Sequence, residues 1–180
     1  MSRPLRGLLR RPLVAILMGS DSDLPIMSET AEILKEFKVP YEIHVLSAHR
    51  SPHLAADFAR QAHAKGLKVL IAGAGGAAHL AGVVAAHSIL PVIGVPVDST
   101  PLNGIDALLA TVQMPAGIPV AAVAVGKSGA RNAGILAVQM LGLSDPEISK
   151  KLSEFKKRLA EGVREKDKKL QKQLSQIKNS

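Results

Sequence analysis

Short apolar runs alternate along the chain with longer stretches in which apolar residues recur every three or four positions. Runs of four to six apolar or β-branched residues predict strands, and apolar residues at a spacing of three and four predict helices with one buried face. A run that is apolar throughout, such as "VIGVPV", is typical of a parallel strand covered on both faces. We expect five strands, at Val14–Met18, Tyr41–Leu46, Lys68–Ala72, Val92–Pro96 and Val120–Val125.

Helical spacing occupies the stretches between these runs and the stretch after the last of them. Strands that alternate with helices indicate parallel strands joined by crossover helices. The expected fold class is therefore α/β, a three-layer, doubly wound parallel sheet. The expected helices span Leu24–Phe37, Pro52–Lys65, Ala77–His87, Ile105–Val112 and Ala130–Leu141.

The pattern changes at Asp145, where a single apolar stripe begins among lysines and glutamates. This stripe predicts a long amphipathic helix. The helix is longer than one small sheet needs for cover, so we expect part of it to pack on a neighbouring subunit, and its last dozen residues to fray as a solvated tail. The stripe consists of Ile148, Leu152, Phe155, Leu159 and Val163.

We find no internal repeat and no linker that would separate two globular domains. A chain of 180 residues can bury a substantial core as one domain. The expected organisation is a basic N-terminal extension at 1–12, an α/β catalytic domain at 13–144, and an amphipathic helix with a basic tail at 145–180.

The amino-acid composition excludes several kinds of functional site. The absence of cysteine excludes disulfides, thiolate metal sites, iron-sulfur clusters and a catalytic thiol. The apolar run Leu13–Met18 is too short for a signal peptide or a transmembrane segment, so we expect a cytoplasmic protein with no membrane partner.

The formal charge of +8 is concentrated at the two ends of the chain. Four arginines precede Pro12 and eleven lysines and arginines follow Asp145, so the middle is close to neutral. With one tyrosine, three phenylalanines and no tryptophan, the chain has few side chains on which bases could stack. We therefore expect no nucleic-acid partner.

Ligands of open parallel sheets bind beyond the carboxyl ends of the strands, which here are followed by three polar or glycine-rich loops. The first loop is "MGSDSDLP". Gly19 permits a tight turn, and Ser20, Ser22 and Asp23 are good helix N-caps. A helix start of this kind suits a phosphate group, although simple capping would also explain it.

The second loop, "LSAHRSPH", places His49 and Arg50 directly after a strand. An arginine can bind a phosphate bidentately, and an imidazole titrates near neutrality, as a group that accepts and returns a proton must. His44 lies within the strand and is expected to be a core or edge residue. His53 suits the helix surface at least as well as the site, and His63 is expected on the surface.

The third loop, "AGAGGAAHLAG", combines four glycines with alanines, so backbone would line a close, mostly apolar pocket. Gly73, Gly75 and Ala78 also fit a loose G-x-G-x-x-A pattern, with Asp98 about twenty residues further on, as in a dinucleotide-binding fingerprint. That fingerprint belongs after the first strand of its unit, whereas this one follows the third. Binding of a nicotinamide dinucleotide is therefore an alternative function for this loop.

Six segments in order resemble the class I 5-(carboxyamino)imidazole ribonucleotide mutases of purine biosynthesis. They are "MGSDSD", "SAHRSP", "AGAGGAAHLAG", "VIGVPVDS", "LNGIDALLATVQMPAGIPV" and "GKSGARNAGILA", and the resemblance runs from about Val14 to Leu141. It implies a flavodoxin-like sandwich, a homo-octamer with sites at subunit contacts, and a small-molecule ribonucleotide substrate without metal or other cofactor. Gly75 to Leu80 retain a Gly-Gly-Ala-Ala-His-Leu run that the sister group, which carboxylates aminoimidazole ribonucleotide directly, usually lacks.

The resemblance also implies roles for individual residues. Ser20 and Arg50 would hold the 5′-phosphate, and Asp23 the ribose hydroxyls. His49 would carry the proton while the carboxyl group moves from nitrogen to the ring carbon. The pocket would be lined by Ser47, Ala74, Gly75, His79 and Leu80.

Two alternatives to the mutase remain open from sequence. One is an ATP-independent carboxylase that uses free carbon dioxide, and the other is a non-enzymatic phosphate-binding module whose basic tail docks an acidic partner. The sequence also departs from the usual family pattern, which puts some contacts in doubt. The departures are at His53, Ala81, His87-Ser88, Ala107 and Ala110.

Overall fold

The computed structural model of the protein describes residues 11–178. Most of the expected basic extension at 1–12, and the last two residues of the expected tail, lie outside the described residues. Of these, residues 11–140 form one compact unit, and residues 141–178 form a second.

The first unit is built on a five-stranded parallel sheet with the order β2-β1-β3-β4-β5. This is the strand order of flavodoxin-like folds, in which the winding reverses between β1 and β3. The expected α/β fold class is confirmed. The strands are β1 (Val14–Met18), β2 (Tyr41–Val45), β3 (Val69–Gly75), β4 (Val92–Val97) and β5 (Ala121–Ala122).

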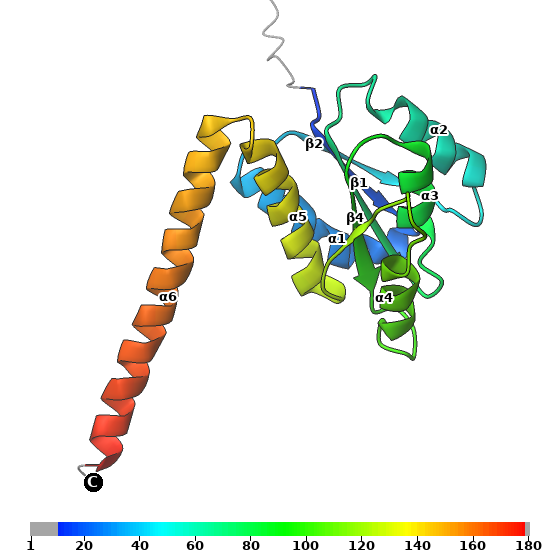
Figure 1. Ribbon diagram of the computed structural model, residues 1–180. Helices are drawn as coiled ribbons and strands as arrows, with labels where there is room; N and C mark the ends of the chain where they lie inside the picture. Colours follow the sequence, from blue (N-terminus) through cyan, green and yellow to red (C-terminus); the bar gives the residue numbers. More distant parts are fainter. Residues whose placement is uncertain (1–10, 179–180) are drawn as a thin grey trace, which may run out of the picture. The chain divides into compact units, whose positions relative to one another are not determined.

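Helices cover both faces of the sheet (Figure 1). On one face α1 packs on α5, and the buried Thr30 hydroxyl donates to the Ala130 carbonyl at 2.7 Å. On the other face α2 and α3 bury alanines, one leucine and one valine against β1 and β3. The helices are α1 (Leu24–Glu36), α2 (Pro52–Ala62), α3 (Leu80–His87), α4 (Ile105–Val112) and α5 (Gly126–Gly142), with a 3₁₀ turn at Asp21–Asp23.

β1 has the expected bounds, and the other four strands differ from the expectation. β2 ends one residue earlier, at Val45, β4 ends one residue later, at Val97, and β3 and β5 differ more. β3 runs on to Gly75, because each residue from Ala72 to Gly75 has a partner in β4, up to the pair Gly75↔Val97. This pairing outweighs the low strand propensity of glycine. β5 keeps only two residues, since its ladder with β4 consists of Ile93↔Ala121 and Gly94↔Ala122.

Two helices begin elsewhere than expected. α3 starts at Leu80, because Ala77 to His79 form a turn in which the His79 amide donates to the Ala77 carbonyl at 2.8 Å. α5 starts at Gly126, four residues before the expected start. Its first turn is rich in glycine, so the sequence pattern carries no helical signal there.

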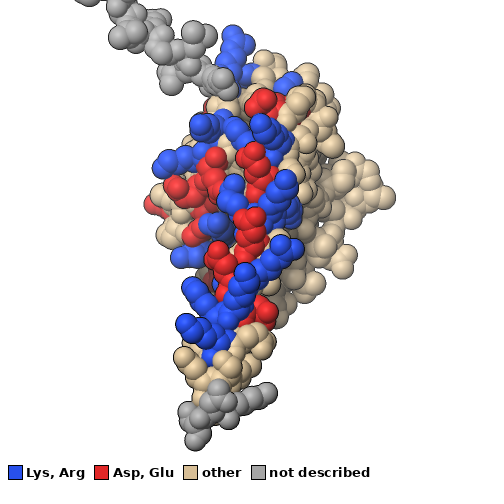
Figure 2. Space-filling model, turned by 90° about the vertical axis from the view of Figure 1, so that its left-hand side faces the viewer, with Lys and Arg blue, Asp and Glu red and all other residues tan. Residues whose placement is uncertain are grey.

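The second unit contains the long helix α6 (Pro146–Lys178), which confirms the expected C-terminal helix. Of the last dozen residues, which we expected to fray as a solvated tail, those up to Ile177 are exposed, and the helix continues as far as Lys178. Good helix formers fill this segment, the apolar spacing continues, and Gln171 bonds to Asp167 one turn earlier at 3.4 Å. Lysines and arginines alternate with acidic side chains along α6 (Figure 2). No helix between residues 11 and 178 has the length and apolarity needed to cross a bilayer.

Gly129 and Gly162 make a matched pair for testing the start of α5. A Cβ at Gly129 would overlap the backbone carbonyl of Ala124, whereas a Cβ at Gly162 in α6 would meet nothing within 4 Å. We expect Gly129→Ala to destabilise the protein by about 2 kcal/mol or more, because backbone must move. Gly162→Ala should be neutral or stabilise α6 by up to ~1 kcal/mol. Urea unfolding followed by circular dichroism measures both, and equal effects would contradict the close approach at Gly129.

Candidate active site

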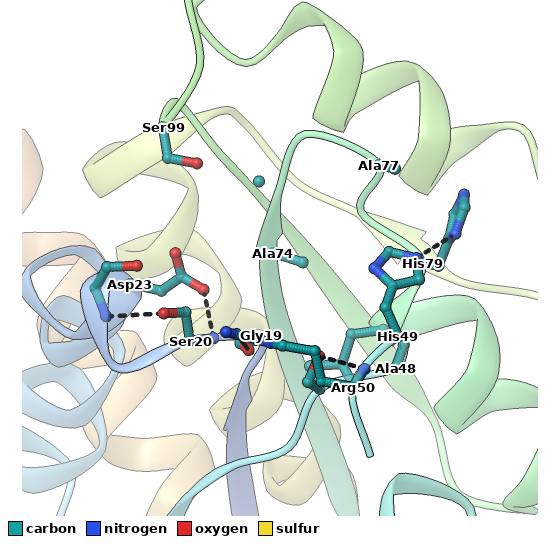
Figure 3. Close-up of a pocket in the computed structure, with 14 residues that line it drawn as sticks. Gly19, Ser20, Asp23, Ala48, His49, Arg50, Ala74, Ala77, His79 and Ser99 are labelled. Atoms are coloured by element: carbon teal, nitrogen blue, oxygen red, sulfur yellow. Dashed lines mark hydrogen bonds between the residues drawn. The ribbon is translucent and has the colours of Figure 1, made fainter. Parts of the chain in front are cut away.

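A cavity of about 350 Å³ lies at the carboxyl edge of the sheet, where the loops after β1, β2, β3 and β4 meet. These loops come together because the carboxyl ends of parallel strands share one edge. In the close-up, Ser20 and Asp23 lie on one side of the cavity, His49 and His79 on the other, and Ala74 between them (Figure 3). The edge predicted from sequence is therefore the edge that carries the cavity.

The loop after β1 is held by a reciprocal cap. The Ser22 amide donates to the Ser20 hydroxyl at 3.4 Å, and the Ser20 amide donates to Oδ2 of Asp23 at 3.1 Å. Ser20 thus caps the 3₁₀ turn, whereas the Asp23 side chain bonds back to Ser20 rather than capping α1. The arrangement leaves a serine hydroxyl and a carboxylate beside a helix start, a setting that suits a sugar phosphate.

Asp23 is a buried carboxyl group, with 5% of its surface exposed. Burial raises its pKa above the ordinary value, because the charged form loses hydration. Hydrogen bonds from the amides of Ser20 and Gly19 pull the pKa back down. The charge of Asp21 raises it, and the charge of Arg50 lowers it by less. Asp23 is therefore a poorly hydrated acceptor that would gain from a ligand able to donate hydrogen bonds.

The loop after β2 is a tight turn closed by two serines. The Ser47 amide donates to the Ser51 hydroxyl, and that hydroxyl donates to the Ser47 carbonyl, both at 3.1 Å. The Arg50 amide donates to the Ser47 hydroxyl at 3.1 Å, and Nη2 of Arg50 donates to the Gly19 carbonyl at 3.0 Å. Arg50 therefore ties the second loop to the first, with its guanidinium beside the serine-rich helix start.

Small residues line much of the cavity, and we call Ala48, Ala74, Gly75 and Ala77 the small-residue wall. A side chain at Gly75 would overlap the hydroxyl of Ser99, which comes from the loop after β4. Backbone at the end of β3 therefore borders the cavity directly, as the glycine-rich loop predicted.

The two histidines of the cavity contact each other. Nε2 of His49 and Nδ1 of His79 lie 2.8 Å apart, with the rings 4.9 Å between centroids and 77° apart in plane. Both side chains are exposed in the single chain. A basic nitrogen is thus held at the cavity, near the small-residue wall.

A comparison of the sequence with known protein families identifies the family of this chain. The sequence model described as AIR carboxylase matches residues 13–162, which is most of the chain. The chain belongs to the AIR carboxylase family. The cavity at the carboxyl edge lies within the matched region.

Similar proteins of this family are known from several organisms. The chain is 55% identical to an N5-carboxyaminoimidazole ribonucleotide mutase of Pyrococcus horikoshii over 161 residues, covering 89% of this chain and 90% of the relative. It is 54% identical to the mutase of the same name from Thermotoga maritima over 160 residues, covering 89% and 92%. A crystal structure of Treponema denticola PurE superposes with a TM-score of 0.80 at 32% identity, covering 89% of this chain and 99% of that one.

All nine predicted site residues of this AIR carboxylase family member line this cavity. Sequence reasoning missed Ser99, although its place directly after β4, at the same edge of the sheet, was a usable signal. The other residues missed are glycine, alanine or serine neighbours of predicted ones. The predicted nine are Ser20, Asp23, Ser47, His49, Arg50, Ala74, Gly75, His79 and Leu80, and the missed ones are Gly19, Ser22, Ala48, Ala77 and Ser99.

The remaining histidines lie away from this cavity. His44 is half-buried on the edge strand β2, with its ring 5.0 Å from that of Phe58, as expected for a core or edge residue. His53 and His63 are exposed on and after α2, and neither lines the cavity. The surface placement expected for His63 is confirmed, and His53 takes the surface rather than the site.

The dinucleotide-fingerprint alternative is wrong. Gly73 and Gly75 lie inside β3 rather than in a turn that leads from a strand into a helix. A Cβ at Gly73 would overlap the sulfur of Met27. The lack of a side chain at Gly73 therefore lets helix α1 pack closely on β3, and it does not make room for a pyrophosphate. The helix that follows begins only at Leu80.

Proposed function

We propose that this member of the AIR carboxylase family is a mutase of purine biosynthesis. It moves the carboxyl group of 5-(carboxyamino)imidazole ribonucleotide from nitrogen to the ring carbon, giving 4-carboxy-5-aminoimidazole ribonucleotide. The observation that carries the proposal is the meeting of an imidazole, an arginine and a capped helix start around one small-residue cavity, in a chain 55% identical to a named mutase. We place the reaction in the cytoplasm, because phosphorylated ribonucleotides do not cross membranes freely.

The nucleotide end of the substrate would bind at the first two loops. Ser20 and Arg50 would hold the 5′-phosphate, since the guanidinium offers several donors and the helix start favours negative charge. Asp23 would accept hydrogen bonds from the ribose hydroxyls. Its raised pKa reflects poor hydration, and two hydroxyl donors would supply the missing interaction.

The heterocycle would then reach the small-residue wall with His49 beside it. The carboxyl–nitrogen bond breaks, carbon dioxide leaves, and the nitrogen keeps the electron pair and takes a proton from protonated His49. The ring carbon, which is enamine-like, adds to the retained carbon dioxide, and neutral His49 removes the hydrogen from that carbon. Proton and carboxyl group both stay within the site, so the steps balance without a cofactor.

Small residues suit this chemistry. A carbamate loses carbon dioxide more readily when its charge is poorly solvated, and a confined site holds the gas near the ring carbon. Ser47, Ala74, Gly75, His79 and Leu80 would supply that confinement.

We further propose that the chain works as a homo-octamer whose partner subunits cover the site. In the single chain His49 and Arg50 are exposed, and α4 and the turn before it present an exposed apolar row at Leu102, Ile105 and Leu109. Contiguous apolar residues of this kind mark subunit contacts. Light scattering of the purified protein should give a mass near eight chains of 18.9 kDa, and a monomeric mass would contradict the proposal.

Labelled bicarbonate separates the mutase from the direct carboxylase. In a single turnover with unlabelled N-carboxylated substrate and ¹³C-bicarbonate, we expect product that carries the substrate's own carboxyl carbon. A carboxylase would release carbon dioxide to the medium and give labelled product. Label uptake at the rate of product formation, or turnover only with aminoimidazole ribonucleotide and bicarbonate, would assign the carboxylase. The absence of product from either substrate would overturn both.

A further inference from the structure

The contact between His49 and His79 joins two loops that are thirty residues apart in sequence. A neutral imidazole has one N–H group and one acceptor nitrogen, so in this contact one ring donates and the other accepts. The tautomer of one ring therefore determines the tautomer of the other. The bond also stops the His49 ring from turning about its side-chain axis.

The His79 ring is placed for this contact by its neighbours. Ala78 and Leu80 are buried, with 2% and 1% of their surfaces exposed, and they fix the backbone on both sides of His79. His79 stands at the N-cap position of α3, but its side chain makes no capping hydrogen bond. Its Nδ1 is thus engaged by the other loop rather than by its own helix.

His49 is held less firmly from its own side. Its loop is closed by Ser47 and Ser51, yet those bonds involve backbone and hydroxyl groups and leave the imidazole exposed. Among residues 11–178, the partner that hydrogen-bonds the His49 ring is His79. Within the single chain, the His49 ring therefore takes its orientation from its hydrogen bond with His79.

We propose that His79 is a positioning residue, whose Nδ1 fixes the orientation and tautomer of the His49 ring. This rests on the proposed mutase function, in which His49 delivers a proton to nitrogen and then removes one from carbon. Both transfers require a ring nitrogen, rather than a ring C–H, to point at the substrate. A ring that turns between the two steps would present a carbon atom, rather than a nitrogen, to the intermediate.

Two substitutions of His79 separate positioning from simple lining of the cavity. In His79→Asn the amide places a polar atom near the position of Nδ1, whereas in His79→Leu a side chain of similar reach has none. We expect His79→Leu to lower kcat about 10-fold or more, with KM within about 3-fold, and His79→Asn to retain most of kcat. A rise in KM at unchanged kcat, or equal losses in the two variants, would overturn the proposal.

A double-mutant cycle with His49→Asn tests whether the two histidines act as a unit. When two residues act together, the fold-loss of kcat in the double variant is smaller than the product of the two single fold-losses. We expect His79→Leu to add little to the loss in the His49→Asn background, and multiplied losses would refute positioning through His49. His53→Leu is the control, because His53 is exposed on α2 and does not line the cavity.

A spectroscopic measurement tests the positioning role of His79 without measuring the reaction. In the ligand-free protein, ¹⁵N chemical shifts of the His49 ring report its tautomer. We expect one dominant tautomer in the parent and in His79→Asn, and a mixture in His79→Leu. Unchanged His49 shifts in His79→Leu would overturn the positioning role even in an active enzyme, whereas absent turnover with the expected shifts would overturn only the mutase function.

Discussion

Replacing His49 with asparagine is expected to lower mutase turnover by about 10²- to 10⁴-fold, the usual contribution of a general acid–base group. The reason is that the reaction needs one group that gives up a proton and recovers it, and asparagine does not titrate. Initial rates in both directions, followed by the ultraviolet absorbance of the carboxylated imidazole, measure the effect.

The fold should survive this change. His49 is exposed in a serine-closed loop, so its substitution removes no core packing, and thermal unfolding and assembly mass should match the parent. His63→Asn is a suitable control, since His63 is exposed after α2 and away from the cavity. A His49→Asn enzyme with nearly normal turnover would remove His49 from the mechanism.

Replacing Arg50 with alanine is expected to raise KM by about 100-fold or more, which corresponds to roughly 3 kcal/mol of lost charge-assisted hydrogen bonding. The guanidinium lies beside the capped turn and also donates to the Gly19 carbonyl at 3.0 Å, so its loss would remove the proposed phosphate contact and loosen the first loop. Steady-state kinetics and isothermal titration with the ribonucleotide product measure the loss.

Arg50→Lys should recover part of the affinity, because it restores charge without the planar fork. Arg60→Ala is the matched control, since Arg60 is an exposed arginine of α2 that pairs with Asp57 on the same helix. Equal KM values for Arg50→Ala and the parent would place the phosphate elsewhere.

The sequence predicted the layers and the site edge because both depend on local signals. β1 and α4 have the predicted bounds, since each is a clear apolar pattern between turn residues. The nine predicted site residues share one cavity because parallel strands bring loops of distant sequence to the same edge. Their roles came from a resemblance, and they remain proposals for the experiments above.

The features that sequence could not predict depend on contacts between distant segments. β3 passes through its glycines to Gly75 because β4 pairs with it there, and Gly73 is small because Met27 approaches it. The partnership of His49 with His79 likewise follows from how two loops fold together, and no spacing in the sequence indicates it. Ser99 was overlooked because a lone serine indicates a site only through its place after a strand, and not through its own chemistry.

The small-residue wall also bears on how the enzyme could be inhibited. A compound that packs on Ala74 and Gly75 would be recognised largely by main chain, which point mutations change little. A larger residue at Gly75 would collide with Ser99 and narrow the cavity in which we propose that the substrate binds. A substitution at the small-residue wall that prevents such a compound from binding would therefore also lower the turnover of the enzyme.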